Sequence, residues 1–172
     1  MLVSLILRVC QLLFAAVVLA LSVVLVHGYG PGHAPSLLDY GVFCGAGALI
    51  FAAVGVLALF LEPLQGIIML ALDGVASFFL LAGAAAFSAK IRSGSCTNGY
   101  YIADILGTIN TSPYKFYAGN GDQQIENAAK DLENRCRIAQ TDEAFLWIVV
   151  ICFIATAVLG FLGKSGKRGA TY

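Results

Sequence analysis

Long apolar runs alternate with shorter polar stretches along this chain of 172 residues. Four runs are long and nearly free of charge, and they cover about residues 2–26, 38–61, 64–89 and 144–162. A helix needs roughly 20 apolar residues to cross the hydrocarbon core of a bilayer. The runs are continuous, whereas the strands of a membrane barrel alternate apolar and polar residues. The pattern therefore predicts an all-α membrane protein, a bundle of four transmembrane helices.

The breaks between the runs support this division. Glycine and proline interrupt helices. Both are frequent in residues 27–35, and proline recurs at Glu62-Pro63, where we expect a tight turn. The first run has a competing interpretation as a cleaved signal peptide, which begins with basic residues and has a short apolar segment. Here Arg8 follows an apolar stretch and the run is long, which favours a span. Residues 164–172 form a short basic tail, separate from the membrane domain over 1–163.

Most of the charge lies in one polar segment, residues 90–141, between the third and fourth runs. Including its borders, the stretch from Lys90 to Glu143 holds thirteen of the twenty charged residues. We expect a large polar loop there. Within it, apolar residues recur at steps of three and four between Asp122 and Arg137, which predicts an amphipathic helix leading into the fourth span. Asp142 and Glu143 mark either a break or the start of that span.

Composition supports the membrane interpretation and reduces the number of functions that the chain could have. The chain is 59% hydrophobic, 12% charged and neutral overall, with a mean hydropathy of +0.85. Soluble domains hold about 45–50% apolar and about 25% charged residues. No basic stripe suggests nucleic acid as a partner. His27 and His33 lie in the first linker without a set of metal ligands around them. We find no catalytic, cofactor-binding or metal-binding motif, and we predict that the protein is not an enzyme.

Three polar residues within the predicted spans need an explanation: Arg8, Gln11 and Asp73. An ionisable residue at the centre of a span costs about 2.5–3.5 kcal/mol on insertion scales and is by default a functional hypothesis. Asp73 lies deep enough to need a partner, either Arg8, Gln11 or a water molecule. It is either a proton or ion ligand, or half of a buried pair that fixes helix packing. Arg8 has the further option of reaching to the membrane interface.

Small residues mark one face of the second span. Gly41 and Gly45 form a GxxxG step, which allows two helix backbones to approach closely. This face packs either inside the four-helix bundle or against another membrane protein, including a second copy of this chain.

Two of the five cysteines lie outside the spans. Cys96 and Cys136 occupy opposite ends of the polar segment, and a disulfide between them is expected if that segment faces an oxidising compartment. Otherwise they are two unrelated thiols. Asn110-Thr111-Ser112 is a glycosylation sequon. Four spans place both termini on one side of the membrane, but the distribution of Lys and Arg does not decide which side.

Several short motifs, taken in order, resemble those of fungal MARVEL-domain proteins. In the first three spans these motifs are Arg8-x-x-Gln11-x-x-Phe14, Phe60-Leu61-Glu62-Pro63-Leu64 and Leu72-Asp73. After them come Cys96, then Arg135-Cys136-Arg137-x-Ala139-Gln140, and then Ala144-Phe145-Leu146. Within that family, the chain is most similar to the non-classical export protein type, which is associated with eisosomes.

The resemblance implies a multi-pass plasma-membrane protein with cytosolic termini and an external polar segment. It implies organisation of static membrane microdomains, a response to sphingolipid levels and support of unconventional secretion. The implied partners are membrane lipids, sphingolipid or sterol among them, together with further copies of the chain or other membrane proteins. Two other functions stay open: an accessory subunit of a larger membrane complex, and a small transporter that uses Asp73.

Overall fold

The computed structural model describes residues 2–58, 60 and 67–168, and within these ranges all of its regular secondary structure is helical. The helices are α1 (Leu2–His27), α2 (Ser36–Ala58), α3 (Ile67–Ile91), α4 (Gly99–Ile109) and α5 (Gly121–Arg168). All except α4 are long and apolar enough to cross a membrane. The predicted all-α fold with four spans is confirmed. The turn predicted at Glu62-Pro63 lies outside the described residues.

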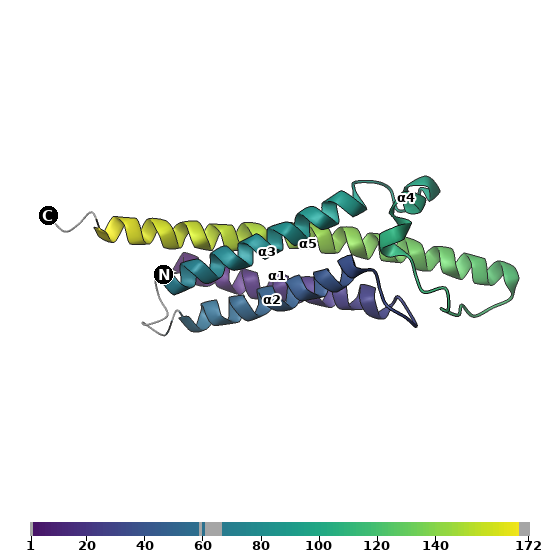
Figure 1. The fold of residues 1–172 in the computed structure, drawn as a ribbon, viewed down its shortest axis with the longest axis horizontal. Coiled ribbons are helices and arrows are strands. Elements are labelled where there is room, and N and C mark those ends of the chain that lie inside the picture. Colours follow the sequence, from purple (N-terminus) through teal and green to yellow (C-terminus); the bar gives the residue numbers. More distant parts are fainter. Residues whose placement is uncertain (1, 59, 61–66, 169–172) are drawn as a thin grey trace.

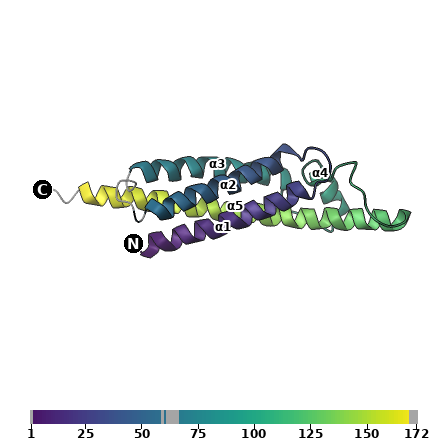
Figure 2. The ribbon, with the colours of Figure 1, turned by 90° about the horizontal axis from the view of Figure 1, so that it is seen from below.

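The four long helices run alternately up and down, so that the first and last described residues lie at the same end of the molecule (Figure 1). Helix α1 packs against α2 and α5, and α3 packs mainly against α5, with a smaller contact to α2. The view from below shows the same order, with α5 between α1 and α3 (Figure 2). The helices thus form a closed ring, and their shared core includes Ala15, Ala52, Phe87 and Phe153.

The polar segment differs from the loop that we expected, because much of it is helical. Helix α5 begins at Gly121 rather than near residue 144 and continues for 48 residues. At about 1.5 Å per residue it is roughly 72 Å long, more than twice the hydrocarbon thickness. The stretch predicted as an amphipathic helix is helical and forms the first part of α5, although Ile125 on its apolar side is 72% exposed. The predicted basic tail is also partly helical, since α5 continues to Arg168.

No break occurs at Asp142, so that alternative is wrong. The physical reason is a continuous stripe of buried residues along α5, at the steps of three and four that one helix face requires. The stripe comprises Arg135, Cys136, Ala139, Asp142, Leu146, Val149, Val150, Phe153 and Thr156. One uninterrupted helix buries all of these residues on the same side, and a kink would turn part of the stripe away from the core.

Helix α4 was not expected, although the chain carries signals for it. Asn98 caps its first turn, accepting a hydrogen bond at 3.0 Å from the backbone N–H of Tyr100. Asparagine is among the preferred residues at this position. The helix buries Ile105 and Ile109 four residues apart, and packs against α5 and the end of α3.

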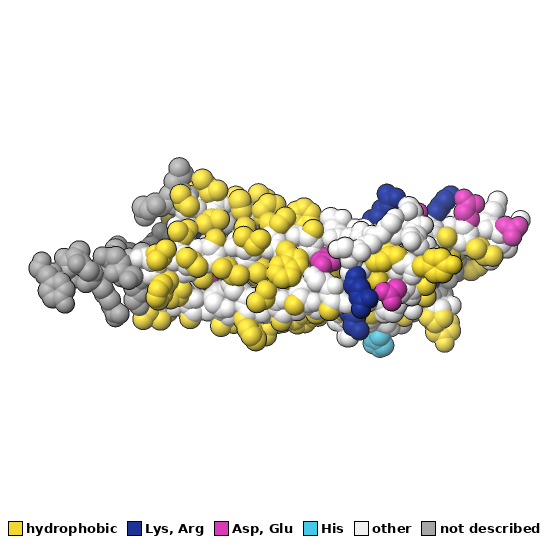
Figure 3. All heavy atoms as spheres, turned by 90° about the horizontal axis from the view of Figure 1, so that it is seen from above, with side chains coloured by type: hydrophobic (Ala, Val, Ile, Leu, Met, Phe, Trp, Pro, Cys, Tyr) yellow, Lys and Arg dark blue, Asp and Glu magenta, His cyan; other side chains and the backbone are white. Residues whose placement is uncertain are grey.

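The surface divides into two regions (Figure 3). Hydrophobic side chains cover the visible part of the four-helix region, and charged side chains gather toward the opposite end of the molecule from the termini. We call α1, α2, α3 and residues 143–168 of α5 the membrane bundle. Residues 92–142, which include α4 and the first part of α5, are the polar cap.

Candidate functional site

The interior of the membrane bundle, toward the end that carries the termini, contains a two-point ion pair between α1 and α3. Arg8 Nη1 donates to Asp73 Oδ1 at 2.7 Å, and Nη2 donates to Oδ2 at 2.6 Å. Both side chains are buried, at 8% and 3% exposure. Such paired contacts between guanidinium and carboxylate are strong and geometrically specific. Asp73 therefore has Arg8 as its partner, and Arg8 does not reach out to the membrane interface.

Gln11 extends this pair to the last helix. Its Oε1 accepts from Arg8 Nη1 at 3.0 Å, and its Nε2 donates to Thr156 Oγ1 at 3.0 Å. Gln11 is fully buried. The three polar residues predicted within the spans thus belong to one network joining α1, α3 and α5. Thr156 was missed, although its place on the buried stripe of α5 was a usable signal.

Helix α2 makes room for the network at Gly55, which has no side chain. A Cβ atom at Gly55 would lie 2.7 Å from Cζ of Arg8, so a larger residue at this position would displace the guanidinium from its present place against α2. Beside the pair lies a hollow of about 220 Å³ near the end of the bundle that carries the termini. Its lining includes Ser4, Met69 and Gly160. The lining also includes Arg8 and Asp73, and their charges neutralise each other.

The predicted GxxxG step faces α1 inside the bundle. A Cβ at Gly45 would lie 2.7 Å from the backbone N and Cα of Leu19, and a Cβ at Gly41 would lie 2.7 Å from Ser22 Oγ. Both glycines are buried. The structure therefore places this step at the α1–α2 contact rather than on an outer face.

A second buried acid, Asp142, joins α1 to α5 at the level where the bundle meets the cap. Ser22 Oγ donates to Asp142 Oδ2 at 2.6 Å. The carboxyl group is fully buried, and Oδ1 has no hydrogen-bond partner among the described residues. Sequence reasoning placed Asp142 at a helix boundary because it weighed the charge and did not follow the three- and four-residue spacing through it.

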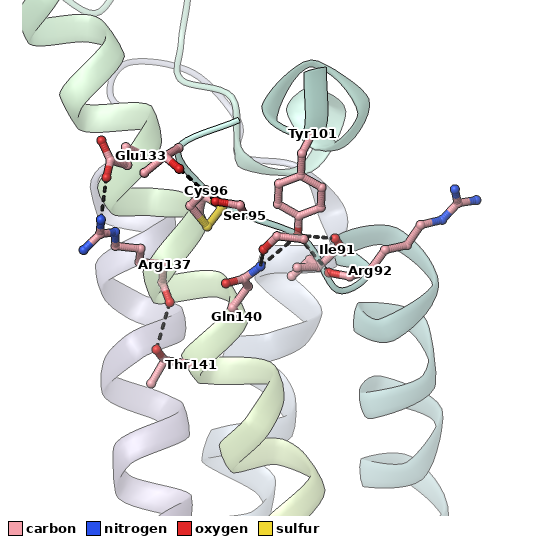
Figure 4. The surroundings of a disulfide bond; sticks show 12 residues. Ile91, Arg92, Ser95, Cys96, Tyr101, Glu133, Arg137, Gln140 and Thr141 are labelled. Carbon is pink, nitrogen blue, oxygen red and sulfur yellow. Dashed lines mark hydrogen bonds and ion pairs between the residues drawn. A yellow bond between two sulfur atoms is a disulfide. The ribbon is translucent and has the colours of Figure 1, made fainter. Parts of the chain in front are cut away.

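The polar cap is held by a disulfide between Cys96 and Cys136 (Figure 4), as predicted. The bond joins the segment before α4 to α5, with 5.8 Å between the two Cα atoms. Near it, Gln140 Nε2 donates to the carbonyl of Gly94 at 2.8 Å and to Tyr101 Oη at 3.0 Å. The end of α3, the start of α4 and the middle of α5 are thereby fixed to one another.

Next to the disulfide, Arg135 stabilises two helix ends. It is 2% exposed and donates to the carbonyl oxygens of Ile109 at 2.7 Å, Leu25 at 3.0 Å and Asn110 at 3.2 Å. The carbonyl groups at the end of a helix lack intrahelical partners and carry partial negative charge. One guanidinium therefore satisfies the C-terminal ends of α1 and α4 together.

The sequon lies in a confined place. Asn110 is half-buried, and its Oδ1 is enclosed without a partner among the described residues. Ser112 Oγ donates to the carbonyl of Pro31, and its backbone N–H donates to the carbonyl of Tyr29 at 2.8 Å. These contacts tie the sequon to the linker between α1 and α2, which is a poor setting for a bulky glycan. Glycosylation of Asn110 stays a prediction.

With this geometry in view, comparison with known families places the chain. The family model of the MARVEL membrane-associating domain matches residues 1–159. Because the match covers most of the chain, the protein belongs to the MARVEL family. No curated protein and no solved structure gave a match. The matched range contains the intramembrane network, the disulfide and all of α4.

Proposed function

We propose that this protein is a non-enzymatic organiser of the plasma membrane, of the eisosome or microdomain type. It associates laterally with lipids and with membrane proteins, including its own copies, and it responds to sphingolipid levels and supports unconventional secretion. Membership of the membrane-associating family over residues 1–159 carries the proposal. The finer assignment rests on the resemblance of the short motifs to the non-classical export protein type.

The distribution of apolar surface supports lateral association. In the most apolar stretch of each long helix, between 28% and 39% of the residues are buried inside the bundle. The remaining residues present a broad apolar exterior to lipid or to a neighbouring transmembrane helix. Among the described residues, the charge of Asp73 is neutralised by Arg8, and Gln11 joins this pair to Thr156 of α5, so Asp73 is not free to hold an ion. A transporter is therefore less favoured than an organiser.

The disulfide supports the proposed orientation. Disulfides persist in oxidising compartments and are rare in the cytosol, and the Cys96–Cys136 bond lies in the polar cap. We therefore assign the cap to the external side. Because the termini lie at the opposite end of the bundle, they are assigned to the cytosol.

The experiment is live imaging of a C-terminally tagged copy in a fungal cell, before and during a block of sphingolipid synthesis. We expect stable patches at the plasma membrane that disperse during the block. A tagged single-span protein, imaged under the same block, controls for general loss of membrane order. A uniform distribution that does not respond to the block would overturn the proposal.

A second candidate, an accessory subunit of a larger complex, is favoured by one observation. The polar cap presents large aromatic side chains to its surroundings: Tyr100 is 91% exposed, Phe116 82% and Tyr114 80%. Exposed aromatic residues commonly mark binding surfaces. Purification in a gentle detergent tests this function, which requires a stoichiometric partner. Recovery of self-associated protein alone would contradict it.

A further inference from the structure

A second hollow lies between the end of α3 and the middle of α5, where the membrane bundle meets the polar cap. Its volume is about 360 Å³, and its lining includes Arg92, Ser93, Gln140, Glu143 and Trp147. Sites for small ligands typically measure about 300–1,000 Å³. Neither the intramembrane network nor the disulfide bond uses the charged and aromatic side chains of this lining.

Two of these side chains are held in place by one hydroxyl group of α3. Ser88 Oγ donates to Glu143 Oε1 at 2.5 Å, and Trp147 Nε1 donates to the same Oγ at 3.0 Å. A carboxylate and an indole ring are thus fixed one helical turn apart on α5. An aromatic ring attracts cations, and recognition of quaternary ammonium groups is a common use of such rings. A neighbouring carboxylate adds direct charge attraction.

On the α3 side of the hollow stands a cation. Arg92 follows the last residue of α3 and adopts a left-handed backbone conformation, with φ 50°. Its side chain extends away from Gln140, past the end of α3 (Figure 4). The side chain is 71% exposed, and its ion pair with Asp104 is long, at 3.8 Å. A surface pair of this kind contributes little, so rotation of the exposed Arg92 side chain is enough to move its guanidinium from Asp104 to an anionic group at the rim of the hollow.

The chemistry of α5 changes with depth along the same face. Glu143, Trp147 and Ile151 follow one another at four-residue steps, each step advancing about 6 Å along the helix. The series passes from a carboxylate to an indole that is 37% exposed and then to an aliphatic side chain that is 63% exposed. Tryptophan gathers at the interface between membrane and water. The order matches a lipid molecule, from its headgroup to its acyl chains.

We propose that this hollow binds the headgroup of a single lipid that carries both an ammonium group and a phosphate. The ammonium group lies against Glu143 and Trp147, and the phosphate lies toward Arg92 at the rim. The acyl chains follow α5 past Ile151. This inference deepens the proposed function, on which it rests for lateral association with lipid, by naming a site and a class of lipid headgroup.

The proposal makes a definite statement about selectivity. A lipid with a phosphate but no ammonium group brings only negative charge to a site that contains Glu143, so it binds less well. Soluble phosphocholine has the correct charges but no acyl chains to contact α5, and it also binds less well. Phosphatidylcholine and phosphatidylethanolamine share the required chemistry, and their relative retention reports whether the ring or the carboxylate dominates.

The test is native mass spectrometry of the purified full chain, released from mixed micelles that contain dioleoyl phosphatidylcholine and dioleoyl phosphatidylglycerol in equal amounts. We expect the first bound lipid to be phosphatidylcholine in about tenfold excess, because the cation–π contact with Trp147 and the charge attraction of Glu143 together correspond to a factor of about ten. In Glu143→Gln this excess is lost, while the glutamine oxygen can still accept from Ser88. Arg92→Gln lowers the retention of both lipids.

The control variant is Glu126→Gln, which removes the same charge from the same helix far from the hollow, where Glu126 is exposed and pairs with Lys130. It should keep the excess of phosphatidylcholine. Equal retention of the two lipids by the unaltered protein, or an unchanged excess in Glu143→Gln, would overturn the site. Displacement of the lipid by millimolar soluble phosphocholine would overturn the lipid as occupant.

The binding measurement is independent of the behaviour of the protein in cells. A failed selectivity test with normal, sphingolipid-responsive patches would overturn this site and leave the proposed function standing. Normal selectivity with a uniform, unresponsive cellular distribution would do the opposite. The two failures can therefore be told apart.

Discussion

The membrane bundle and the polar cap are held together by different interactions. In the bundle, a buried ion pair between Arg8 and Asp73 crosses the ring of helices, and Gly45 lets α2 contact α1 closely. In the cap, the helices are held together by a disulfide and by the three hydrogen bonds of Arg135 to backbone carbonyl groups. The bundle is joined by polar contacts between side chains, whereas the cap adds to such contacts a covalent bond and hydrogen bonds to helix ends.

The surrounding medium explains this difference. Lipid tails are as apolar as leucine, so membrane helices gain little from burying apolar surface and depend on close packing and interhelical polar contacts. The cap stands in water, but it is too small to bury much apolar surface. Small domains of this kind commonly depend on disulfides. The following predictions test whether the two regions can be weakened separately.

The largest effect is expected at the ion pair. Either Arg8→Gln or Asp73→Asn leaves an uncompensated charge in the core, which should lower the free energy of unfolding by about 3–5 kcal/mol. The double variant should recover much of this loss. Thermal unfolding in detergent measures all four proteins of the cycle, with Arg92→Gln as a control at an exposed pair. Simple additivity of the two single losses would contradict a direct interaction.

Asp73→Asn also separates the candidate functions. Loss of clustering together with loss of stability fits an organiser whose bundle depends on the pair. A well-folded Asp73→Asn protein that clusters normally but loses a transport activity would instead favour the transporter.

Loss of the disulfide should weaken the cap alone. The bond closes a loop of 40 residues, which corresponds to about 4 kcal/mol in the chain-entropy model. In Cys96→Ser we expect rapid proteolysis within residues 92–142, while the membrane bundle keeps its protease resistance. Cys152→Ser is the matched control, because Cys152 is a free cysteine in the bundle. Equal weakening of both regions would show that they unfold as one unit.

Close packing in the bundle is tested by two glycines of α2. Gly45→Ala forces a Cβ against the backbone of Leu19, and overpacking of this kind costs about 1–3 kcal/mol. Gly47→Ala meets no atom within 4 Å and should be neutral or slightly stabilising, since alanine favours helix. Their melting temperatures in detergent should differ accordingly. Equal melting temperatures would mean that α1 and α2 do not depend on this contact.

The smallest effect concerns pH and the exposed start of α5. A hydrogen bond and the positive charge from Lys130 hold the pKa of Glu126 below its ordinary value of 4.5. Because the folded-state pKa is the lower one, this pair stabilises the helix above the ordinary pKa. The contribution is lost as the pH falls through the folded-state pKa. Hydrogen exchange of the first turns of α5 below pH 4.5 should increase less in Glu126→Gln than in the unaltered protein.

Much of the polar cap was within reach of sequence reasoning, although not all of it was obtained. The cysteine pair and the amphipathic start of α5 follow from local patterns. So does α4, since Asn98 and the spacing of its isoleucines mark a capped helix, although the polarity of this segment by itself favours a loop. The continuity of α5 was also readable, because its buried stripe runs through Asp142.

The sequence by itself determined the solvent of each segment and therefore the four spans, because only a bilayer suits apolar runs of that length. It also determined which residues were costly: Arg8, Gln11 and Asp73. Only the tertiary structure decided which partners stabilise these buried polar residues. Arg8 and Asp73 are 65 residues apart, and their pairing depends on how the helices are arranged around the ring. Helical periodicity fixes which face a residue occupies, but the neighbour of that face is set by packing between distant segments.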